Sequence, residues 1–344
     1  MIREAISKLI SGESLGMEEA AAVMEEIMQG EATPAQLAAF VTALRIKGET
    51  VDEIAGLAQV MRSKAVRVVA SGPVLDIVGT GGDNANTFNI STAAAFVAAG
   101  TGLKVAKHGN RAMSSQCGSA DVLEALGVKI DLDAAQVERC LEEGGIGFMF
   151  APVFHPAMKH ASAPRREIGI RTVFNILGPL TNPAGAEYQV LGVADESLLE
   201  KMTAVLKRLG CHHVLVVHGE DGIDEMTITG KTDICELKDN GINSYTVTPE
   251  DFGLSRTSRT SLKGGTASEN AELLLQTLSG NPGPQRDAVV LNAAAGLIAS
   301  DHAATFKEGI ALAGEAIDSG HAREKLERLV ELSQSLGRGE ANDS

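Results

Sequence analysis

The sequence predicts an α/β protein that has a small N-terminal helical domain and a large α/β domain with a mainly parallel central sheet. Over roughly the first 65 residues, apolar side chains recur with helical spacing and without strand-like alternation. From Val74 onwards, short apolar runs alternate with helical stretches, which is the order of a parallel, doubly wound sheet. We expect residues 1–68 to form the helical domain, joined by about 165–185, and residues 70–344 to form the α/β domain.

Four helices are expected in the N-terminal domain, over Ile2–Ile10, near Met17–Met28, from Thr33 to near Gly48 and from Thr50 to about Met61. Thr33 is an N-cap followed by proline at the first helical position. Thr50 and Glu53 form a capping box. A bundle of four short helices is thin, so its apolar stripes are expected to pack on another chain or on the rest of the protein.

The α/β domain follows as strands and helices in alternation. Strands are expected over Val74–Val78, Lys104–Ala106, Gly147–Phe150, Val190–Ala194 and Val214–Val217, and helices over Ser91–Ala99, Ser119–Leu126 and Ala134–Glu142. The segment Arg165–Pro183 interrupts this order with a helical run that can return to the helical domain. Thr227–Thr248 predicts a short antiparallel section, and the chain is mainly helical from Ala267, with a polar tail over Gly339–Ser344.

Composition excludes several classes of partner. The chain has 344 residues, 44% of them hydrophobic, with 30 Lys and Arg against 45 Asp and Glu and a formal net charge of −15. Nucleic acids and anionic membranes require clustered positive charge, so neither is an expected partner. Aromatic residues make up only 3%, which argues against stacking on single-stranded nucleic acid.

The cysteines and the apolar runs indicate a cytoplasmic protein. The four cysteines lack C-x-x-C spacing, which suits a reducing compartment and argues against a zinc knuckle; they are Cys117, Cys140, Cys211 and Cys235. The N-terminus has no long apolar run, so no signal peptide is expected. The longest apolar stretches, such as Ala93–Ala99, are too short to span a bilayer.

A glycine-rich loop after the first expected strand is the strongest local signal. Gly79, Gly81 and Gly82 stand within four residues, and Ser91 and Thr92 follow at the start of an apolar helix, where either could cap the helix or donate to phosphate. Glycine lets the backbone approach a ligand, and a helix start offers free N–H groups to phosphate. The spacing is neither a Walker A motif nor a Rossmann fingerprint. A tight turn without a ligand is the alternative interpretation.

A second polar loop, Lys107–Arg111, is expected after the strand Lys104–Ala106, followed by Ser114, Ser115 and a helix start at Gly118-Ser119. Loops at the carboxyl ends of neighbouring parallel strands meet in one cleft, where open α/β sheets bind ligands. A solvated charged loop is the alternative.

An acidic pair, Asp224 and Glu225, follows the strand Val214–Val217. Carboxylates together with substrate phosphate oxygens are the ligands that Mg²⁺ prefers. An acidic surface turn is the alternative. His212 and His213 stand at a strand start and are not taken as metal ligands.

Together these motifs resemble those of the anthranilate phosphoribosyltransferase family, in order and over nearly the whole chain. The resemblance rests on Gly79–Asp83, Asn89–Thr92, Lys107–Arg111, Gly169–Thr172, Asn175–Pro183 and Asp224-Glu225. The glycine loop is shared with pyrimidine nucleoside phosphorylases, whereas Lys107–Arg111 and Asn175–Pro183 are far more specific.

The resemblance implies a fold of the nucleoside phosphorylase/phosphoribosyltransferase type and a homodimer formed through the helical domain. It implies a pentosyl-transferring glycosyltransferase that moves the phosphoribosyl group of phosphoribosyl pyrophosphate (PRPP) to the amine of anthranilate. The products would be N-(5-phosphoribosyl)anthranilate and pyrophosphate, in the second step of tryptophan biosynthesis from chorismate. Magnesium, as two ions, is the implied cofactor.

Site residues are implied in the same way. The PRPP contacts would be Gly79, Gly82, Asp83, Thr87, Asn89, Ser91, Thr92, Lys107, His108, Gly109, Asn110 and Ser119. The anthranilate contacts would be Gly79, His108, Asn110, Arg165, Gly178 and Pro179, and the metal ligands Ser91, Asp224 and Glu225. No acid or base catalyst is expected; Lys107, Asp224 and Glu225 would stabilise charge. Whether Arg165 or Arg166 pairs with the anthranilate carboxylate stays open.

Two other functions compete with this one. A nucleoside phosphorylase would cleave a pyrimidine nucleoside with phosphate and without magnesium. A non-catalytic binding protein, for example for nucleic acid, would have a basic groove and broken motifs, whereas this chain is acidic and its motifs are whole.

Overall fold

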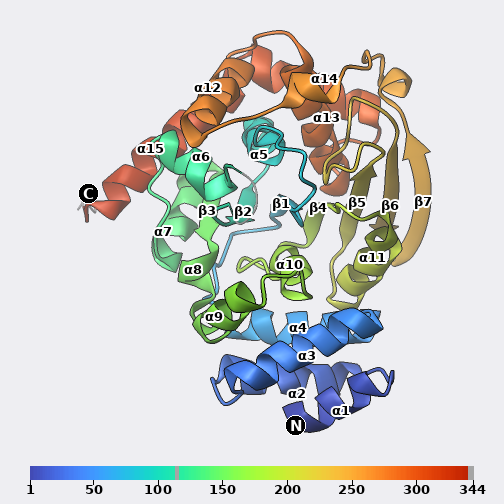
Figure 1. Ribbon diagram of the computed structural model, residues 1–344. Helices are drawn as coiled ribbons and strands as arrows, with labels where there is room; N and C mark the ends of the chain where they lie inside the picture. The colour runs from blue at the N-terminus through green and yellow to red at the C-terminus, as the bar shows by residue number, and fades with distance from the viewer. Residues whose placement is uncertain (113–115, 340–344) are drawn as a thin grey trace.

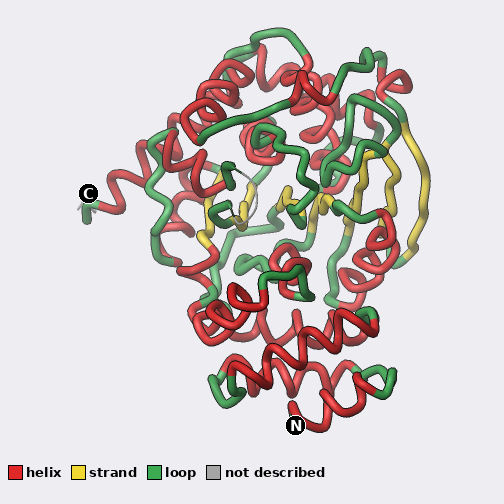
Figure 2. Tube along the Cα trace, viewed as in Figure 1, coloured by secondary structure: helices red, strands yellow, loops and turns green. Residues whose placement is uncertain are grey.

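The computed structural model describes residues 1–112 and 116–339 of the chain (Figure 1). Ser114 and Ser115 of the second polar loop lie outside the described residues, as does 340–344 of the expected polar tail. The N-terminal helices form one end of the molecule, and the sheet lies between them and a layer of C-terminal helices. Figure 2 shows the strands as a single central layer with helices around it.

The N-terminal domain contains the four expected helices, α1 (Ile2–Ile10), α2 (Met17–Met28), α3 (Pro34–Lys47) and α4 (Val51–Lys64). Both predicted caps are present, because Thr33 Oγ1 accepts from Gln36 N–H at 3.2 Å and Thr50 Oγ1 accepts from Glu53 N–H at 3.3 Å. Helix α4 runs one turn beyond the expected end. That turn is fixed by Arg62, which donates to the carbonyls of Leu180 and Leu209.

The sheet has seven strands in the order β3-β2-β1-β4-β5-β6-β7. They are β1 (Leu75–Gly79), β2 (Val105–Gly109), β3 (Ile146–Phe150), β4 (Tyr188–Gly192), β5 (His213–Gly219), β6 (Thr232–Lys238) and β7 (Gly241–Val247). Strands β1 to β5 pair parallel with one another, and β6 pairs antiparallel with both β5 and β7. The prediction of a mainly parallel sheet with a short antiparallel section is confirmed.

Several strand boundaries differ from the expected ones: β4 is shifted two residues towards the N-terminus, β5 ends two residues later, and β2 ends three residues later. Lys107, His108 and Gly109 were expected in a loop, but they form the end of β2 and pair with β3. Lys107 and His108 are buried. Charged and polar side chains are rare in buried parallel strands, so the apolar pattern ended the predicted strand too early.

Two apolar cores lie on opposite sides of the sheet. The first includes Leu75 and Ile77 of β1 together with the C-terminal helices, and the second joins the helical domain to residues of β4 and β5.

The α/β-domain helices are α5 (Ile90–Gly100), α6 (Ser119–Ala125), α7 (Ala134–Arg139) with a π turn over Cys140–Gly144, α8 (Ala151–Phe154), α9 (Lys159–Ile168), α10 (Phe174–Leu177), α11 (Leu199–Arg208), α12 (Ala267–Leu278), α13 (Pro284–Ala299), α14 (Phe306–Asp318) and α15 (His321–Gly337).

The short helices α9 and α10 lie between the sheet and the helical domain (Figure 1), and α9 contacts α3 while α10 contacts α4. The carboxyl ends of β1 and β2 therefore face a layer built from both parts of the chain. In the part of the chain that the structure describes, no helix is both long enough and apolar enough to cross a membrane.

Gly56 of α4 allows α2 and α4 to pack closely, because a Cβ atom there would collide with the carbonyl oxygen of Met17. We expect Gly56→Ala to lower the free energy of unfolding by about 1–3 kcal/mol through overpacking. Gly314 of α14 is the matched control, because the nearest atom to its Cβ position is 3.8 Å away. Gly314→Ala should raise stability by about 0.5–1 kcal/mol through helix propensity. Urea unfolding measures both, and an unchanged midpoint for Gly56→Ala would contradict this account of the packing.

Candidate active site

A cavity of about 320 Å³ lies at the carboxyl ends of β1, β2 and β5. The glycine loop, the start of α5, the end of β2, the start of α6 and the acidic pair all line it. Every residue that was expected to contact PRPP lines this cavity: Gly79, Gly82, Asp83, Thr87, Asn89, Ser91, Thr92, Lys107, His108, Gly109, Asn110 and Ser119. The structure therefore brings together motifs that are up to about 150 residues apart, as parallel strand ends in one sheet must.

The glycine loop is wrapped around Asp224. Gly81 donates its backbone N–H to Asp224 Oδ2 at 2.6 Å, and a Cβ atom on Gly79 would collide with the same carboxylate. Gly82 has a φ of +75°, and its Cα lies against the guanidinium of Arg171. Arg171 in turn donates to the carbonyl of Gly81 at 2.9 Å. These glycines are required both for close approach and for a left-handed backbone.

The start of α5 differs from the expected arrangement. The N-cap is Asn89, so neither Ser91 nor Thr92 caps the helix. The Ser91 N–H, one of the free amides expected for phosphate, donates to Glu225 Oε1 at 3.2 Å. The buried Thr92 hydroxyl has no hydrogen-bond partner among the described residues. The helix start thus holds an acidic side chain and keeps one hydroxyl free beside the cavity.

Lys107 supplies the buried positive charge of the site. Its Nζ donates to the carbonyl of Ile77 at 2.7 Å and lies 3.4 Å from Ser91 Oγ. Burial lowers the pKa of Lys107, and the carboxylates of Asp76 and Glu225 oppose that change. The other cation of the second polar motif, Arg111, is instead paired with Asp121 and Glu124 at the surface.

Asp224 and Glu225 form a buried pair of carboxyl groups. Burial, and then the nearby charge of Asp83, raise the pKa of Asp224 to about 6. Burial, and then the charge of Asp224, raise the pKa of Glu225 to about 8. Burial and mutual repulsion thus disfavour the negative charge of this pair, and a bound cation would stabilise it.

The donors at this point suit magnesium. Asp224, Glu225 and the Ser91 hydroxyl are hard oxygen donors that line the same cavity. Within the described ranges, no group of three or more His, Cys, Asp or Glu is arranged to hold a metal. The two carboxylates and the hydroxyl fit Mg²⁺, which binds through one or two carboxylates and completes its shell with phosphate oxygens and water.

A second cavity of about 400 Å³ adjoins the first, between the sheet and the helical domain. It is lined by Met61 of α4, by Pro152 of α8, by Met158 of the 3-10 turn Pro156–Met158 and by residues of α9. Four side chains line both cavities, and they are His108, Asn110, Arg165 and Phe174. Gly178 also lines the second cavity, whereas Pro179 lines neither one; its carbonyl accepts from the buried side chain of Gln189.

Arg165 lies at the junction of the two cavities. Its guanidinium carbon lies 4.9 Å from the centre of the Phe174 ring, and burial lowers its pKa. No carboxylate of the described chain pairs with it, so a half-buried guanidinium is available to an anionic ligand. Arg166 is exposed and lines only the second cavity. The geometry therefore favours Arg165 as the residue that meets a ligand spanning both cavities.

Two histidines at this junction are neutral. The rings of His108 and His155 lie 5.1 Å apart between centres. Burial lowers the pKa of His108 to about 3 and that of His155 to about 4, and His155 contributes to the shift of His108. Their buried Nε2 atoms have no hydrogen-bond partner within the described residues. Neutral rings with a free nitrogen can donate to or accept from a ligand without adding charge.

Sequence reasoning assigned no role to several residues of this site. Arg171 stands within one of the motifs but has no expected function, and none is expected for Phe174, His155 or Cys117, although all four line one of the cavities. An arginine that follows a glycine turn is a detectable signal. A histidine or phenylalanine at a helix end is not, because such residues are common in cores.

The fold and the paired cavities define a glycosyl transferase. The model of the glycosyl transferase family, a/b domain, matches residues 71–323, and that of the family's helical bundle domain matches residues 3–65. The chain belongs to the anthranilate phosphoribosyltransferase family. It is 61% identical to the anthranilate phosphoribosyltransferase of Dehalococcoides mccartyi, over 98% of this chain and 100% of the relative.

Solved structures agree with this assignment. Anthranilate phosphoribosyltransferase from Thermus thermophilus superposes with a TM-score of 0.91 and 49% identity, over 96% of this chain and 99% of the other. The Saccharomyces cerevisiae enzyme in complex with PRPP and Mg superposes with a TM-score of 0.89 and 31% identity, over 97% and 98% of the two chains. The same yeast enzyme with 4-fluoroanthranilate gives 0.87 and 30% over the same shares.

The raised pKa of Glu225 predicts how the folding stability of the protein depends on pH in magnesium-free buffer. The folded protein holds this proton more tightly than the unfolded chain does, so folding loses stability as the pH rises from about 4.5 to about 8. Glu225→Gln removes the charge and should raise the melting temperature relative to the parent protein at pH 9, with little change at pH 5. The exposed Glu200 provides a control, and Glu200→Gln should show no such pH dependence. An equal effect of Glu225→Gln at both pH values would contradict the assignment.

Proposed function

We propose that the protein transfers the phosphoribosyl group of PRPP to the amine of anthranilate, giving N-(5-phosphoribosyl)anthranilate and pyrophosphate. This is the second step of tryptophan biosynthesis from chorismate. The observation that carries the proposal is the pair of adjoining cavities, one polar and lined by backbone amides, Lys107 and carboxylates, the other more apolar and reached by the unpaired Arg165. PRPP suits the first cavity and anthranilate the second.

The polar cavity would hold PRPP by neutralising a compact, highly charged ligand. The cavity is lined by Gly79, Gly82 and Asp83 of the glycine loop, by Ser91 and Thr92 with their hydroxyls, and by Lys107. The remaining proposed contacts also line it, and they are Thr87, Asn89, His108, Gly109, Asn110 and Ser119. Amide and hydroxyl donors can bind phosphate without requiring a net positive surface.

Magnesium would be held by Asp224, Glu225 and Ser91, as two ions shared with the substrate phosphates. When bound, Mg²⁺ neutralises charge on the departing pyrophosphate. The protein holds the two carboxylate ligands in position before the metal binds. Gly81 fixes the Asp224 carboxylate through its N–H, and Ser91 fixes Glu225 in the same way.

In the reaction, the bond between ribose C1 and the pyrophosphate oxygen breaks and the bond from C1 to the anthranilate nitrogen forms. Negative charge collects on pyrophosphate, and positive charge builds on the ribose ring, which becomes oxocarbenium-like. Lys107 and the loop amides stabilise the leaving group. The aromatic amine is already a nucleophile, and the nitrogen loses its proton to solvent or pyrophosphate afterwards. No side chain is needed as a strong base, in keeping with the neutral His108.

Anthranilate would be oriented by its carboxylate. Arg165 can pair with it in a bidentate manner from the junction of the cavities, while His108, Asn110, Gly178 and Pro179 shape the surrounding wall. Gly79 would contact it at the edge of the polar cavity. Holding the amine over C1 supplies most of the remaining rate enhancement.

We also propose that residues 1–68, joined by about 165–185, act as the helical domain, and residues 70–344 as the α/β domain. Support comes from the second core, in which Phe174, Ile176 and Leu177 pack with the N-terminal helices. A cytoplasmic homodimer through the helical domain is part of this proposal. Ile10 and Ile46 are 74% and 81% exposed on that domain, which suits an apolar contact between copies.

The function is tested by mixing the protein with anthranilate, PRPP and Mg²⁺ and following the loss of anthranilate fluorescence. Pyrophosphate should appear in equal amount. No loss of fluorescence, together with phosphate-dependent release of base from thymidine or uridine, would overturn the proposal in favour of a nucleoside phosphorylase.

Arg165→Ala should raise the KM for anthranilate by about a hundredfold, because a charge-assisted bidentate pair is lost, and should change the KM for PRPP much less. Arg166→Ala is the matched control and should leave both values within about threefold. Steady-state kinetics with each substrate varied in turn measures the two constants. Equal increases for both substrates in Arg165→Ala would contradict the assigned role.

The double variant Asp224→Asn with Glu225→Gln keeps the shape of both side chains and removes their charges. We expect it to require at least about tenfold more Mg²⁺ for half-maximal activity, because both carboxylate ligands are lost. The measurement is activity against Mg²⁺ concentration at saturating substrates. An unchanged magnesium dependence would rule out these two residues as the ligands.

A further inference from the structure

Strands β1 and β2 separate as they approach the active site. Strand β1 pairs with β4 along five positions, from Leu75 with Tyr188 to Gly79 with Gly192. On its other side, β1 pairs with β2 only at Leu75 and Val105. A parallel pair in mid-sheet normally continues its ladder, so the polar groups beyond this position need other partners.

Two side chains bridge the separated strands. Asn182 donates from Nδ2 to Asp76 Oδ2 on β1 and to the carbonyl of Ala106 on β2, both at 2.8 Å. One residue further along each strand, Lys107 of β2 donates to the carbonyl of Ile77 on β1 at 2.7 Å. Side chains thus replace ladder hydrogen bonds at the point where the strands enter the site.

Asp76 is the least expected member of this group. It is fully buried, and its Oδ1 has no hydrogen-bond partner among the described residues. Burial raises the pKa of Asp76 to about 6, and Lys107 and Asn182 are the first two groups that oppose the rise. Two carboxylates favour the charged form of Lys107, Asp76 before Glu225. Glu225 belongs to the proposed metal site. Of the two carboxylates, Asp76 is therefore the one that interacts with Lys107 and not with a proposed metal ion.

We propose that Asp76 and Asn182 are positioning residues that act through Lys107: together they hold the gap between β1 and β2 and fix the ammonium group at the wall of the phosphate cavity. This rests on the proposed function, because it assigns the two residues to the binding of PRPP. Neither residue lines either cavity, so neither touches a ligand there.

A purely structural role would predict something different. A buried polar bridge that only supports the fold should change stability when it is lost, without a preference for one substrate. A role through Lys107 should appear as weaker binding of PRPP, with the affinity for anthranilate little changed. It should also depend on the presence of Lys107, because residues that act through a common group are not additive.

The test is a double-mutant cycle on Asp76→Asn and Lys107→Met, with the dissociation constant of PRPP measured by calorimetry in the presence of Mg²⁺ and the absence of anthranilate. Asp76→Asn keeps the shape of the side chain and an oxygen that can accept from Asn182. We expect it to weaken PRPP binding by about tenfold in the parent protein and by less than about twofold in the Lys107→Met background. Effects that add in the double variant would overturn the proposal.

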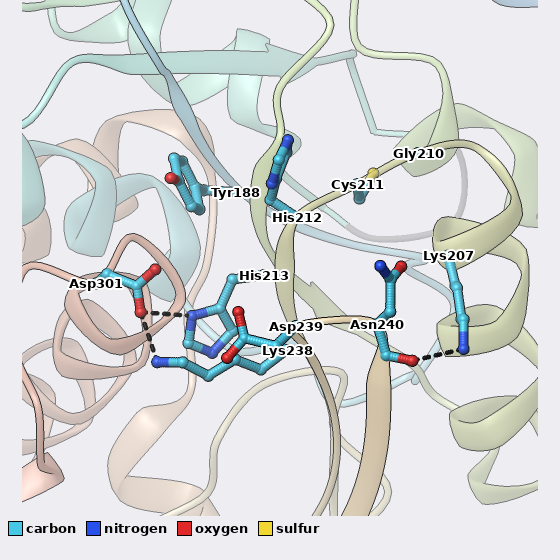
Figure 3. A pocket seen from close by; sticks show the side chains of 10 residues that line it. All are labelled: Tyr188, Lys207, Gly210, Cys211, His212, His213, Lys238, Asp239, Asn240 and Asp301. Atoms are coloured by element: carbon cyan, nitrogen blue, oxygen red, sulfur yellow. Dashed lines mark hydrogen bonds and ion pairs between the residues drawn. The ribbon is translucent and has the colours of Figure 1, made fainter.

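His213 provides a matched control at the other end of the sheet (Figure 3). It is a buried polar bridge, with Nδ1 3.0 Å from Asp301 Oδ1 and Nε2 2.7 Å from Glu236 Oε1. Figure 3 shows Lys238 beside it, bonded to the same Asp301. His213→Gln should lower the melting temperature and leave PRPP binding unchanged. Equal loss of PRPP affinity in His213→Gln and Asp76→Asn would overturn the proposal, because stability alone would then account for it.

Asn182→Ser is a second variant that tests the same proposal if Asp76→Asn does not fold. It retains one donor but cannot bridge both strands, so PRPP binding should weaken by about three- to tenfold, while the KM for anthranilate changes little. Unchanged PRPP affinity in Asn182→Ser would overturn the proposal. A parent protein that binds PRPP but consumes no anthranilate would refute the proposed function and leave this cycle interpretable.

Discussion

Lys107 is a buried ammonium group at the centre of the active-site wall, and the surrounding structure is arranged to keep it charged. An isolated charge at this depth would lose its proton, and burial does lower the pKa of Lys107. Asp76 and Glu225 oppose that loss from two directions, one from β1 and one from the loop after β5. The carbonyl of Ile77 then fixes the position of the group. The gap between β1 and β2 is what makes room for this arrangement.

The burial of charge also determines how the acidic side of the site is arranged. Asp224 and Glu225 are buried beside Lys107, and each accepts one backbone N–H, from Gly81 and Ser91 respectively. These two bonds tie the glycine loop and the start of α5 to one short acidic segment. A bound cation and a phosphorylated substrate would complete the charge balance that the protein leaves open. Binding and local order are therefore coupled at this place.

Helices were predictable because their signals are local. The bounds of α1 and α2 follow from apolar spacing, and Thr33 and Thr50 mark the starts of α3 and α4 through side-chain caps that involve only the next three residues. The glycine loop, the acidic pair and their meeting at strand ends were also predictable, since topology brings parallel strand ends together. The finer assignment of ligand contacts came from a family resemblance and stays a prediction.

The features that could not be predicted depend on contacts between residues that are far apart in the sequence. Lys107 was placed in a loop because a buried lysine contradicts the strand pattern, and only Asp76 and Glu225 explain why the position is tolerated. Asn182 bridges to Asp76 across 106 positions of sequence, and no periodicity reports such a contact. The helix start at Ser91 was expected to offer its amide to phosphate, but a carboxylate 134 residues away accepts it.

The overall charge of −15 first argues against an anionic ligand, and the site resolves that conflict. A net negative surface repels an extended polyanion that is read by a broad basic face. A small phosphorylated ligand feels mainly the groups within a few ångströms, because water and salt screen the rest within about 8–10 Å. Here those groups are loop amides, hydroxyls, Lys107 and Arg171, with carboxylates placed where a divalent cation can convert them into attraction. Local preorganisation, and not net charge, decides what this cavity can bind.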